Sequence, residues 1–538
     1  MGLNHIGRKI ITTHYPVIDR TNILDVIQSA MVTFRENAAD CQFLIDYEKG
    51  VQPLQRKNPK QFMKNIDFEC VDGVPTEISD FWISFSYGTP ITFVQRGDIT
   101  DGNPNTAKAI ANLNNQYALT DSLKDLQRLG RFVTITGIAY SYVNINTEWE
   151  KGEAYFTRSI LDPRNAFIVR SSYYPDGRAM LAATFGMDAD KNIYMTAWTK
   201  DYRFEIYGDS GSPVIPTADN KKKSSYYFGE YSWREMDRSG EKNPLGRIPI
   251  VEWIRSDDRT GVFEKQIPAI DNLNLILSDI SNGVDQMVQS CWLAVDVELP
   301  TTTYVNEDGE TVEVQQGVRD GEWLFTYSSQ DGKRPSVSPL TLDYKLDEMR
   351  NNYLSQRSLI LEKCHVPQRN DSSGSSSSNA LQVASGWSES ENIAGAQECL
   401  TVGCQNEEIK VILAAIRESF GITDITMDDP LMELMPSDIE PCVRRPKNYE
   451  LTVKTNAFCA LLAKGASIED ALAAAPLVPD PAQFIARSGD GIRKYQEANV
   501  WKTTDAEETR PFADISDQIK QSPLVDGMTT GTDGVVEE

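Results

Sequence analysis

The chain has 538 residues, which at roughly 150 residues per domain predicts three or four folding units. It carries 53 Lys and Arg against 78 Asp and Glu, so its formal net charge is −25, and 40% of its residues are hydrophobic. This composition is typical of a globular, strongly acidic protein. It argues against a sequence-specific DNA-binding protein, because such a protein neutralises phosphates with a basic face.

Short sequence patterns argue against several other protein classes. No window approaches the roughly 18 consecutive apolar residues of a membrane helix, and residues 1–10 lack the apolar run of a secretory signal, so we expect synthesis in the cytosol. The eight cysteines include no CxxC pair and only three histidines exist, which disfavours a metal site and a disulfide framework. Walker A, HExxH and GxGxxG motifs are absent, so we expect no cofactor.

The first predicted elements are a helix and a β-rich region. Residues 20–47 carry apolar side chains at helical spacing, namely Ile23, Val26, Ile27, Met31 and Phe34. From Phe132 to Asn146, β-branched and aromatic residues alternate with small or polar ones, which predicts a strand that enters a hairpin. Strand-like patterns continue to Val251, so we expect a large β-rich unit.

A long helix with one apolar stripe is predicted from residue 263 onward, because apolar residues recur there at steps of three and four. The stripe consists of Phe263, Ile267, Ile270, Leu273, Leu277, Ile280, Val284 and Met287. Residues 292–341 return to short strand-like pieces and turns, and a second stripe then predicts a helix over 342–365. Two long helices therefore bracket a small insert that contains β structure.

The last third of the chain is predicted to be mostly helical. A Ser-rich stretch at 371–379 is typical of a flexible linker, and a long helix with several glycines follows it. Ser467 to Asp470 (SIED) has the pattern of an N-terminal capping box before a short helix. Residues 501–538 hold nine acidic and three basic residues with little apolar periodicity, so we expect a disordered acidic tail.

One string resembles a catalytic loop. Residues 208–213 (GDSGSP) are similar to the nucleophile loop of chymotrypsin-like serine proteases, with Ser210 as the nucleophile. The base would have to be a histidine, and those upstream are His5 and His14, far from the β-rich pattern. The alternative is a tight turn between two strands, which we favour. Abundant carboxylates include no pair in an apolar setting, so no catalytic residue is named.

Four stretches share their order with one family of proteins. They are YEKGVQPLQR (47–56), the hairpin stretch ending in Asp-Pro (129–169), LGRIPIVEW with the following long helix (245–287), and the Ser-rich loop with the later ASIEDALAAAPLVPDPAQF (466–484). In this order the chain resembles the portal proteins of tailed bacteriophages, in particular the branch of long-tailed phages of Gram-positive hosts. It departs from that pattern at 271–274, where a tyrosine-containing version is usual, and in its long Ser-rich loop.

The resemblance implies an α+β, multidomain subunit with a β-rich wing, two stem helices around a small α/β clip, a tunnel loop with a long kinked helix, and a helical crown. The implied units are the wing with an N-terminal helical region (1–262), first stem helix (263–292), clip (293–341), second stem helix (342–365), tunnel loop (366–380), long kinked helix (381–421), wing return strand (422–448), crown (449–500) and acidic tail (501–538).

The implied function is a non-enzymatic ring of about twelve copies at one capsid vertex, through which double-stranded DNA passes without sequence specificity. Its implied partners are the terminase large subunit, the head–tail adaptor, the major capsid protein and a scaffolding protein, in the virion and, during assembly, in the host cytoplasm. The tunnel loop would present Arg369, Ser372, Ser373, Ser375, Ser376, Ser377 and Ser378 to DNA. On the clip, Lys333 and Arg334 would face the motor or the adaptor.

Two other functions stay open at this point. A serine protease would use Ser210, and another structural virion protein, such as a capsid or baseplate subunit, would assemble with a different symmetry. The hypothesis of a ring has independent support from the apolar stripes of the two long helices, because a long helix with a single apolar stripe needs a packing partner to be stable.

Overall fold

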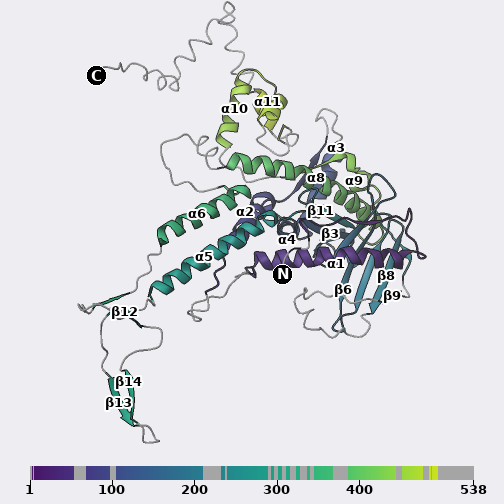
Figure 1. Cartoon of the computed structure of the whole chain (residues 1–538). Coiled ribbons are helices and arrows are strands. Elements are labelled where there is room, and N and C mark those ends of the chain that lie inside the picture. Colours follow the sequence, from purple (N-terminus) through teal and green to yellow (C-terminus); the bar gives the residue numbers. More distant parts are fainter. Residues whose placement is uncertain are drawn as a thin grey trace, which may run out of the picture.

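The computed structural model describes most of the chain. The described residues are 3, 5–53, 68–96, 104–209, 232–236, 239–288, 292–295, 301–305, 311–315, 323–326, 336–339, 345–367, 386–443, 451–475, 484–485 and 488–494. Figure 1 shows a body of sheets and helices from which two long helices, α5 (Ile267–Val288) and α6 (Leu346–Lys363), project side by side. The fold is therefore a mixed α+β, multidomain arrangement, as predicted.

The largest sheet has seven strands and is covered on one face by helix α1 (Ile23–Glu48). Its strands lie in the order β1 (Ile11–Thr13), β5 (Ala166–Ser171), β6 (Ala179–Met187), β7 (Ile193–Trp198), β8 (Tyr202–Asp209) and β10 (Glu241–Lys242), and β9 (Ser232–Glu235) also pairs with β8. Phe34 of α1 packs between Phe167 and Phe185, with ring centroids 5.0 and 5.3 Å away. The predicted N-terminal helix is thus confirmed, and its apolar stripe faces the sheet.

A second sheet joins the first to the helices. It consists of β11 (Ile250–Ile254), β3 (Ile138–Ile145) and β4 (Phe156–Leu161), and it packs against α4 (Ser122–Thr136) and the long helix α8 (Trp387–Glu418). The core of this region also takes side chains from α3 (Pro104–Ala118), β2 (Thr92–Gln95) and β17 (Ile439–Cys442). A short helix α9 (Pro430–Glu433) and a 3₁₀ turn η4 (Pro436–Asp438) precede β17.

The predicted strand over Phe132–Asn146 is wrong in its first third. Residues 132–136 form the last turn of α4, and β3 begins only at Ile138. Gly137 ends the helix in the left-handed conformation, with φ +82°, and its amide donates to the carbonyl of Val133. Burial of Val133 and Ile135 outweighs the weak helix propensity of this β-branched run.

The two long helices begin and end close to the predicted bounds. A 3₁₀ turn η3 (Glu264–Gln266) leads into α5, and α2 (Val74–Tyr87) packs beside α6. Between α5 and α6 the described strands are β12 (Trp292–Val295), β15 (Trp323–Thr326) and β16 (Ser336–Pro339), which form one small sheet, and the hairpin β13 (Thr301–Val305) with β14 (Thr311–Gln315). The predicted β-containing insert between two helices is confirmed.

The end of the described chain is a small helical unit. Helix α10 (Leu451–Ala463) packs on α11 (Ile468–Ala474), on the side of α8 away from the sheets in Figure 1. The predicted cap at Ser467 is present, since its side chain accepts a hydrogen bond from the amide of Asp470 at 3.0 Å. The predicted acidic tail, 501–538, lies outside the described residues.

Candidate functional site

The predicted apolar stripe of α5 divides into two halves. Phe263, Ile267, Ile270 and Leu273 are buried in a cluster with residues of α1, α2, α6 and α8. Farther out, Leu277 and Ile280 are half-buried and Val284 is 46% exposed. The side chain of Met287 lies outside the described part. The inner half therefore belongs to the core of the single chain, whereas the outer half is left partly uncovered.

Helix α6 also carries both buried and exposed apolar side chains. Near its last turn Ile360 and Leu361 are buried, and the indole nitrogen of Trp82 donates to the carbonyl of Cys364 at 3.0 Å. Leu354 and Leu359 are 49% and 42% exposed. The pair of helices is thus anchored to the body at one end, and apolar side chains remain exposed along its length.

A buried charge holds the start of α5. One carboxylate oxygen of Glu264 accepts hydrogen bonds from the amide of Gly7, at 2.7 Å, and from the guanidinium of Arg8, at 2.5 Å. Its other oxygen accepts from the amide of Gly261 at 2.7 Å. Both charged side chains are fully buried. Glu264 therefore ties the base of α5 to a segment more than 250 residues away.

Two of the stretches that carry the family resemblance meet beside this anchor. The hydroxyl of Tyr47, from YEKG, donates to the carboxylate of Asp271 at 2.6 Å. Burial raises the pKa of Asp271 above its usual range, against the hydrogen bond from Tyr47, which lowers it. Burial and the neighbouring carboxylate also raise the pKa of Tyr47. Tyr47 and Asp271 thus fix the end of α1 to the first turns of α5.

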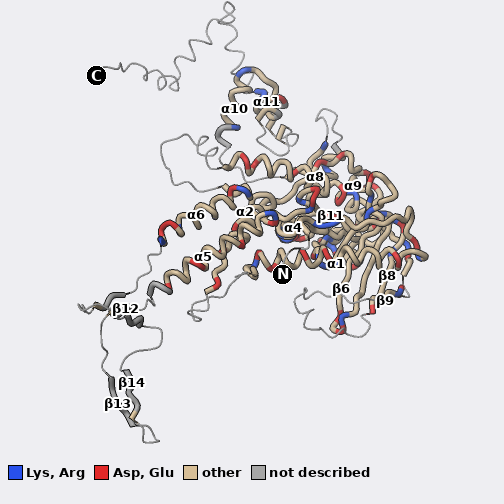
Figure 2. Tube along the Cα trace, in the orientation of Figure 1, with Lys and Arg blue, Asp and Glu red and all other residues tan. Residues whose placement is uncertain are grey.

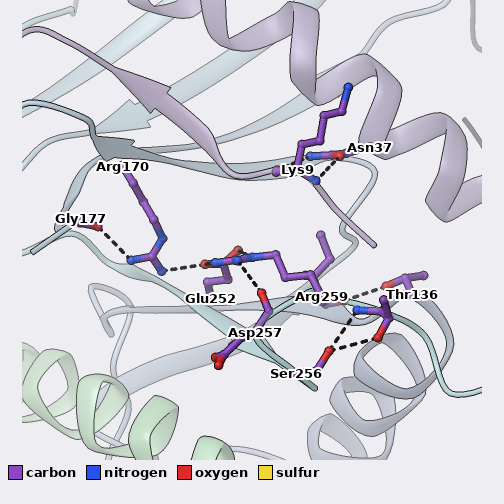
Figure 3. Close-up of polar contacts among 11 residues, drawn as sticks. Lys9, Asn37, Thr136, Arg170, Gly177, Glu252, Ser256, Asp257 and Arg259 are labelled. Atoms are coloured by element: carbon purple, nitrogen blue, oxygen red, sulfur yellow. Dashed lines mark hydrogen bonds and ion pairs between the residues drawn. The ribbon is translucent and has the colours of Figure 1, made fainter. Parts of the chain in front are cut away.

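A second charge network joins the two main sheets, and Figure 3 shows it with Glu252 between two arginines. Glu252 of β11 accepts from Arg259, at 3.1 Å to each oxygen, and from Arg170 of β5 at 2.7 Å. Burial by itself would raise the pKa of Glu252, but the hydrogen bonds and charges of the two arginines lower it below its usual range. Because these groups satisfy one another, we assign the network to structure rather than to chemistry.

The residues predicted to meet DNA or a motor lie outside the described residues. These are Lys333, Arg334, Arg369, Ser372, Ser373 and Ser375 to Ser378. The described residues on either side of the serines are close together, because His365 Nδ1 lies 2.9 Å from Glu389 Oε1. The hydroxyl of Ser390 also donates to the carbonyl of His365 at 2.7 Å. The end of α6 and the start of α8 therefore lie side by side.

The topology of the large sheet disfavours the serine protease alternative. Ser210 lies outside the described residues, but Gly208 and Asp209 end β8. His14 follows β1, and three strands separate β1 from β8, so the two strands are about 19 Å apart. The strands also run in opposite directions, which puts their ends at opposite ends of the sheet. His14 is therefore badly placed to act as a base for Ser210.

Other candidate sites find no support in the described ranges. Within them, no group of three or more His, Cys, Asp or Glu is arranged to hold a metal ion. Among the helices of the same ranges, none is both long and apolar enough to cross a membrane. A buried polar face of α5 was not predicted from the sequence; it is lined by Asn274, Ser278 and Asn282. Their regular spacing of four residues is the signal that could have found them.

The sequence matches the model of one known protein family. The sequence model of the family described as "Phage portal protein, SPP1 Gp6-like" matches residues 69–416, more than half of the chain. A search of curated proteins finds no match. Among solved structures, the chain is similar to the neck of an empty gene transfer agent (GTA) particle, with TM-score 0.37 and 10% identity over 76% of this chain and 91% of the other. It is also similar to the virion of a native GTA particle, with TM-score 0.34, 10% identity and the same coverage.

Proposed function

Because the chain belongs to the phage portal protein family, we propose that about twelve copies close into a ring at one vertex of the capsid, where the ring serves as a connector. Double-stranded DNA passes through the centre of this ring during packaging and ejection. The family is structural, so the chemistry of DNA movement belongs to a partner. We propose the terminase large subunit as that partner during packaging and the head–tail adaptor afterwards.

The observation that carries the ring is the uneven burial of α5 and α6. Apolar side chains at the base of α5 are covered by the same chain, whereas Val284 farther out on α5 and Leu354 and Leu359 on α6 are 42–49% exposed. A neighbouring copy would cover these side chains, and burial of each would add favourable free energy to ring closure. The stripe residues from Phe263 to Met287 would thus serve both the core and the seam between subunits.

The proposed units keep the bounds expected from the sequence. Residues 1–262 would form the wing, 263–292 and 342–365 the stem, and 293–341 the clip that faces the motor or the adaptor. Residues 366–380 would be the tunnel loop, 381–421 the long helix, 422–448 the return to the wing, and 449–500 the crown. The major capsid protein and a scaffolding protein would contact the outside of the ring during assembly in the host cytoplasm.

Electrostatics supports a channel that does not hold DNA. About twelve copies at −25 each carry roughly −300, which repels a polyanion. Helix α5 contains Asp271, Asp279 and Asp285 and no Lys or Arg, and Figure 2 shows only acidic charge along its described length. Local contacts with phosphates would come from Arg369 and from the hydroxyls of Ser372, Ser373 and Ser375 to Ser378. Lys333 and Arg334 would lie at the mouth.

The test of the ring is electron microscopy of the purified protein together with its particle mass. We expect rings with a central hole and a mass about twelve times 60.2 kDa. Open lattices or rings without a channel would contradict the portal and favour another structural virion protein. A monomer that stays a monomer when the capsid and scaffolding proteins are added would also contradict it.

A further inference from the structure

A short segment is held along α5 by main-chain hydrogen bonds. We name residues 68–72 the clasp. Asn282 both accepts from the amide of Phe68, at 2.8 Å, and donates to its carbonyl, at 3.2 Å. Ser278 accepts from the amide of Cys70 at 3.0 Å, and its single hydroxyl proton is shared between the carbonyl of Asn274, at 2.7 Å, and that of Cys70, at 3.3 Å. Asn274 accepts from the amide of Asp72 at 2.8 Å. The clasp therefore runs antiparallel to the helix.

The matching repeats of helix and extended chain explain why side chains four residues apart on α5 reach every second residue of the clasp. Four residues of a helix rise about 6 Å, and two residues of an extended chain advance about 6.6 Å, so the two repeats nearly match. The three helix side chains bond to backbone amides and carbonyls of the clasp, and every residue except proline has both groups. The clasp is thus recognised by its main chain rather than by its side chains.

The clasp contributes little apolar packing. Phe68 and Val71 are 53% and 38% exposed, whereas Asn274, Ser278 and Asn282 beneath it are at most 2% exposed. When the clasp leaves, these three neutral polar side chains are uncovered, and water can replace each hydrogen bond that they lose. Opening therefore costs much less than it would over an apolar face.

The Asp72 end of the clasp is anchored to α6. The carboxylate of Asp72 accepts hydrogen bonds from the hydroxyl of Tyr353 and from Arg357 Nε, both on α6, the latter at 3.3 Å. Helix α2 begins two residues later, at Val74, which is fully buried. The clasp can therefore separate from α5 at its Phe68 end while Asp72 stays attached to α6.

We propose that the clasp is a releasable strap that opens from Phe68 while the ring works. Closed, it joins α5 to α6 and holds the face of α5 between Asn274 and Asn282. Open, it frees that face, and the outer part of α5 can move relative to α6. This proposal rests on the proposed portal function for its purpose, but the opening itself is a property of the chain.

A cross-link can lock the strap. Cys70 Sγ lies 3.3 Å from Ser281 Oγ, so Ser281→Cys places two thiols side by side across the clasp. A mild thiol oxidant closes the disulfide and dithiothreitol reopens it. The matched control is Cys70→Ser combined with Ser281→Cys, which cannot form this cross-link. Hydrogen exchange of the 68–72 peptide, followed by mass spectrometry, reports opening in the full-length protein.

We expect the clasp amides to exchange faster than the α5 amides of residues 271–278, and the cross-link to slow them. Asn282→Ala removes two hydrogen bonds and should speed exchange by about tenfold or more. Cys70→Pro, which removes an amide, should speed it as well, whereas Cys70→Ala should not. Clasp exchange as slow as that of α5, and unchanged by the cross-link, would overturn the proposal.

DNA packaging then tests whether opening is used. We expect packaging by oxidised Ser281→Cys rings to stop and to return after reduction, with no effect of oxidation on the control. Equal packaging by oxidised and reduced rings, with the cross-link verified, would overturn the role in the working ring. Failure of the wild-type ring to package would instead contradict the portal function, and the exchange measurements would still decide whether the strap opens.

Discussion

Buried glutamates with arginine partners join parts of the chain that are far apart in sequence. Glu264 pairs with Arg8 at the base of α5, and Glu408 of α8 pairs with Arg158 of β4 at 3.0 Å. All four side chains are fully buried. The loss of one partner leaves an uncompensated charge in the core, so such pairs are costly to break even where they add little net stability.

Glu264→Ala should destabilise the protein strongly. Arg8 would keep its buried charge and two amides would lose their acceptor, so we expect a loss of about 3–5 kcal/mol in the free energy of unfolding. Urea denaturation followed by circular dichroism measures it. The matched control is Glu348→Ala, which breaks an exposed pair with Lys345 and should cost less than about 1 kcal/mol. Equal losses in the two variants would contradict this account.

The pH dependence of stability should carry the signature of Asp271. Its pKa is raised in the folded protein, first by burial, so the folded state binds this proton more tightly than the unfolded chain. Its contribution to stability is then full below the unfolded pKa and is lost as the pH rises through the folded pKa. Relative to wild type, Asp271→Asn should therefore gain stability between about pH 4 and about pH 7.

Glu36 provides a control of opposite sign for that measurement. A hydrogen bond from Lys9 is the main cause that lowers its pKa, so its contribution is present at neutral pH and is lost as the pH falls. Glu36→Gln should lose stability relative to wild type as the pH rises to about 5, because the wild-type contribution is gained at and below the ordinary carboxylate pKa. Denaturation midpoints at several pH values give both slopes, and slopes of the same sign would refute the assignment.

At the scale of elements, long apolar stripes were the reliable signal. Helices α1, α5 and α6 were predicted because each repeats apolar residues over several turns. Helices α2, α3 and α4 were not predicted. α4 ends in a β-branched run, and only its contacts with α1, α2 and β3 make helix the better choice there. Tertiary packing determines that these segments are helical, and tertiary packing cannot be derived from the pattern of a single sequence.

Gly137→Ala should destabilise the junction of α4 and β3. Gly137 has φ +82°, and a Cβ there would lie 2.3 Å from the carbonyl oxygen of Arg259. We expect a loss of about 2 kcal/mol or more, of which the left-handed backbone accounts for about 1–2. Gly186→Ala is the control, because a Cβ there meets nothing within 4 Å. Thermal unfolding compares the two, and similar melting temperatures would contradict the prediction.

At the scale of the whole molecule, the exposed outer half of α5 matters most. Whether copies close into a ring depends on small angles at their interfaces. These angles cannot be derived from the periodicity or the composition of the sequence. The sequence could therefore predict the stripe but not which residues of it face a neighbour. Ile270, an attractive test position from the sequence, is fully buried in the single chain, so a charge there would disturb the fold first.

Val284→Asp is the sharper test of ring closure. Val284 is 46% exposed in the single chain, so the aspartate should leave the melting temperature of the monomer nearly unchanged. In a seam it would bury a charge, and we expect rings to be lost. Val284→Thr keeps the shape without the charge and should still assemble. Sedimentation and electron microscopy measure ring content, and normal rings from Val284→Asp would exclude this part of α5 from the seam.

The contact between Gly7, Arg8 and Glu264 has a consequence for when the subunit matures. The hydrogen bonds from Gly7 and Arg8 to Glu264 span 257 and 256 residues, so they close a long loop, and contacts of such separation form late. During synthesis, β1 cannot pair until β5 has been made, and Arg8 cannot pair with Glu264 until the turn before α5 has been made. The base of α5 is therefore completed only after nearly half of the chain has been made. This order delays the completion of α5, whose outer half is the proposed seam, until the strands that pair with β1 have been made.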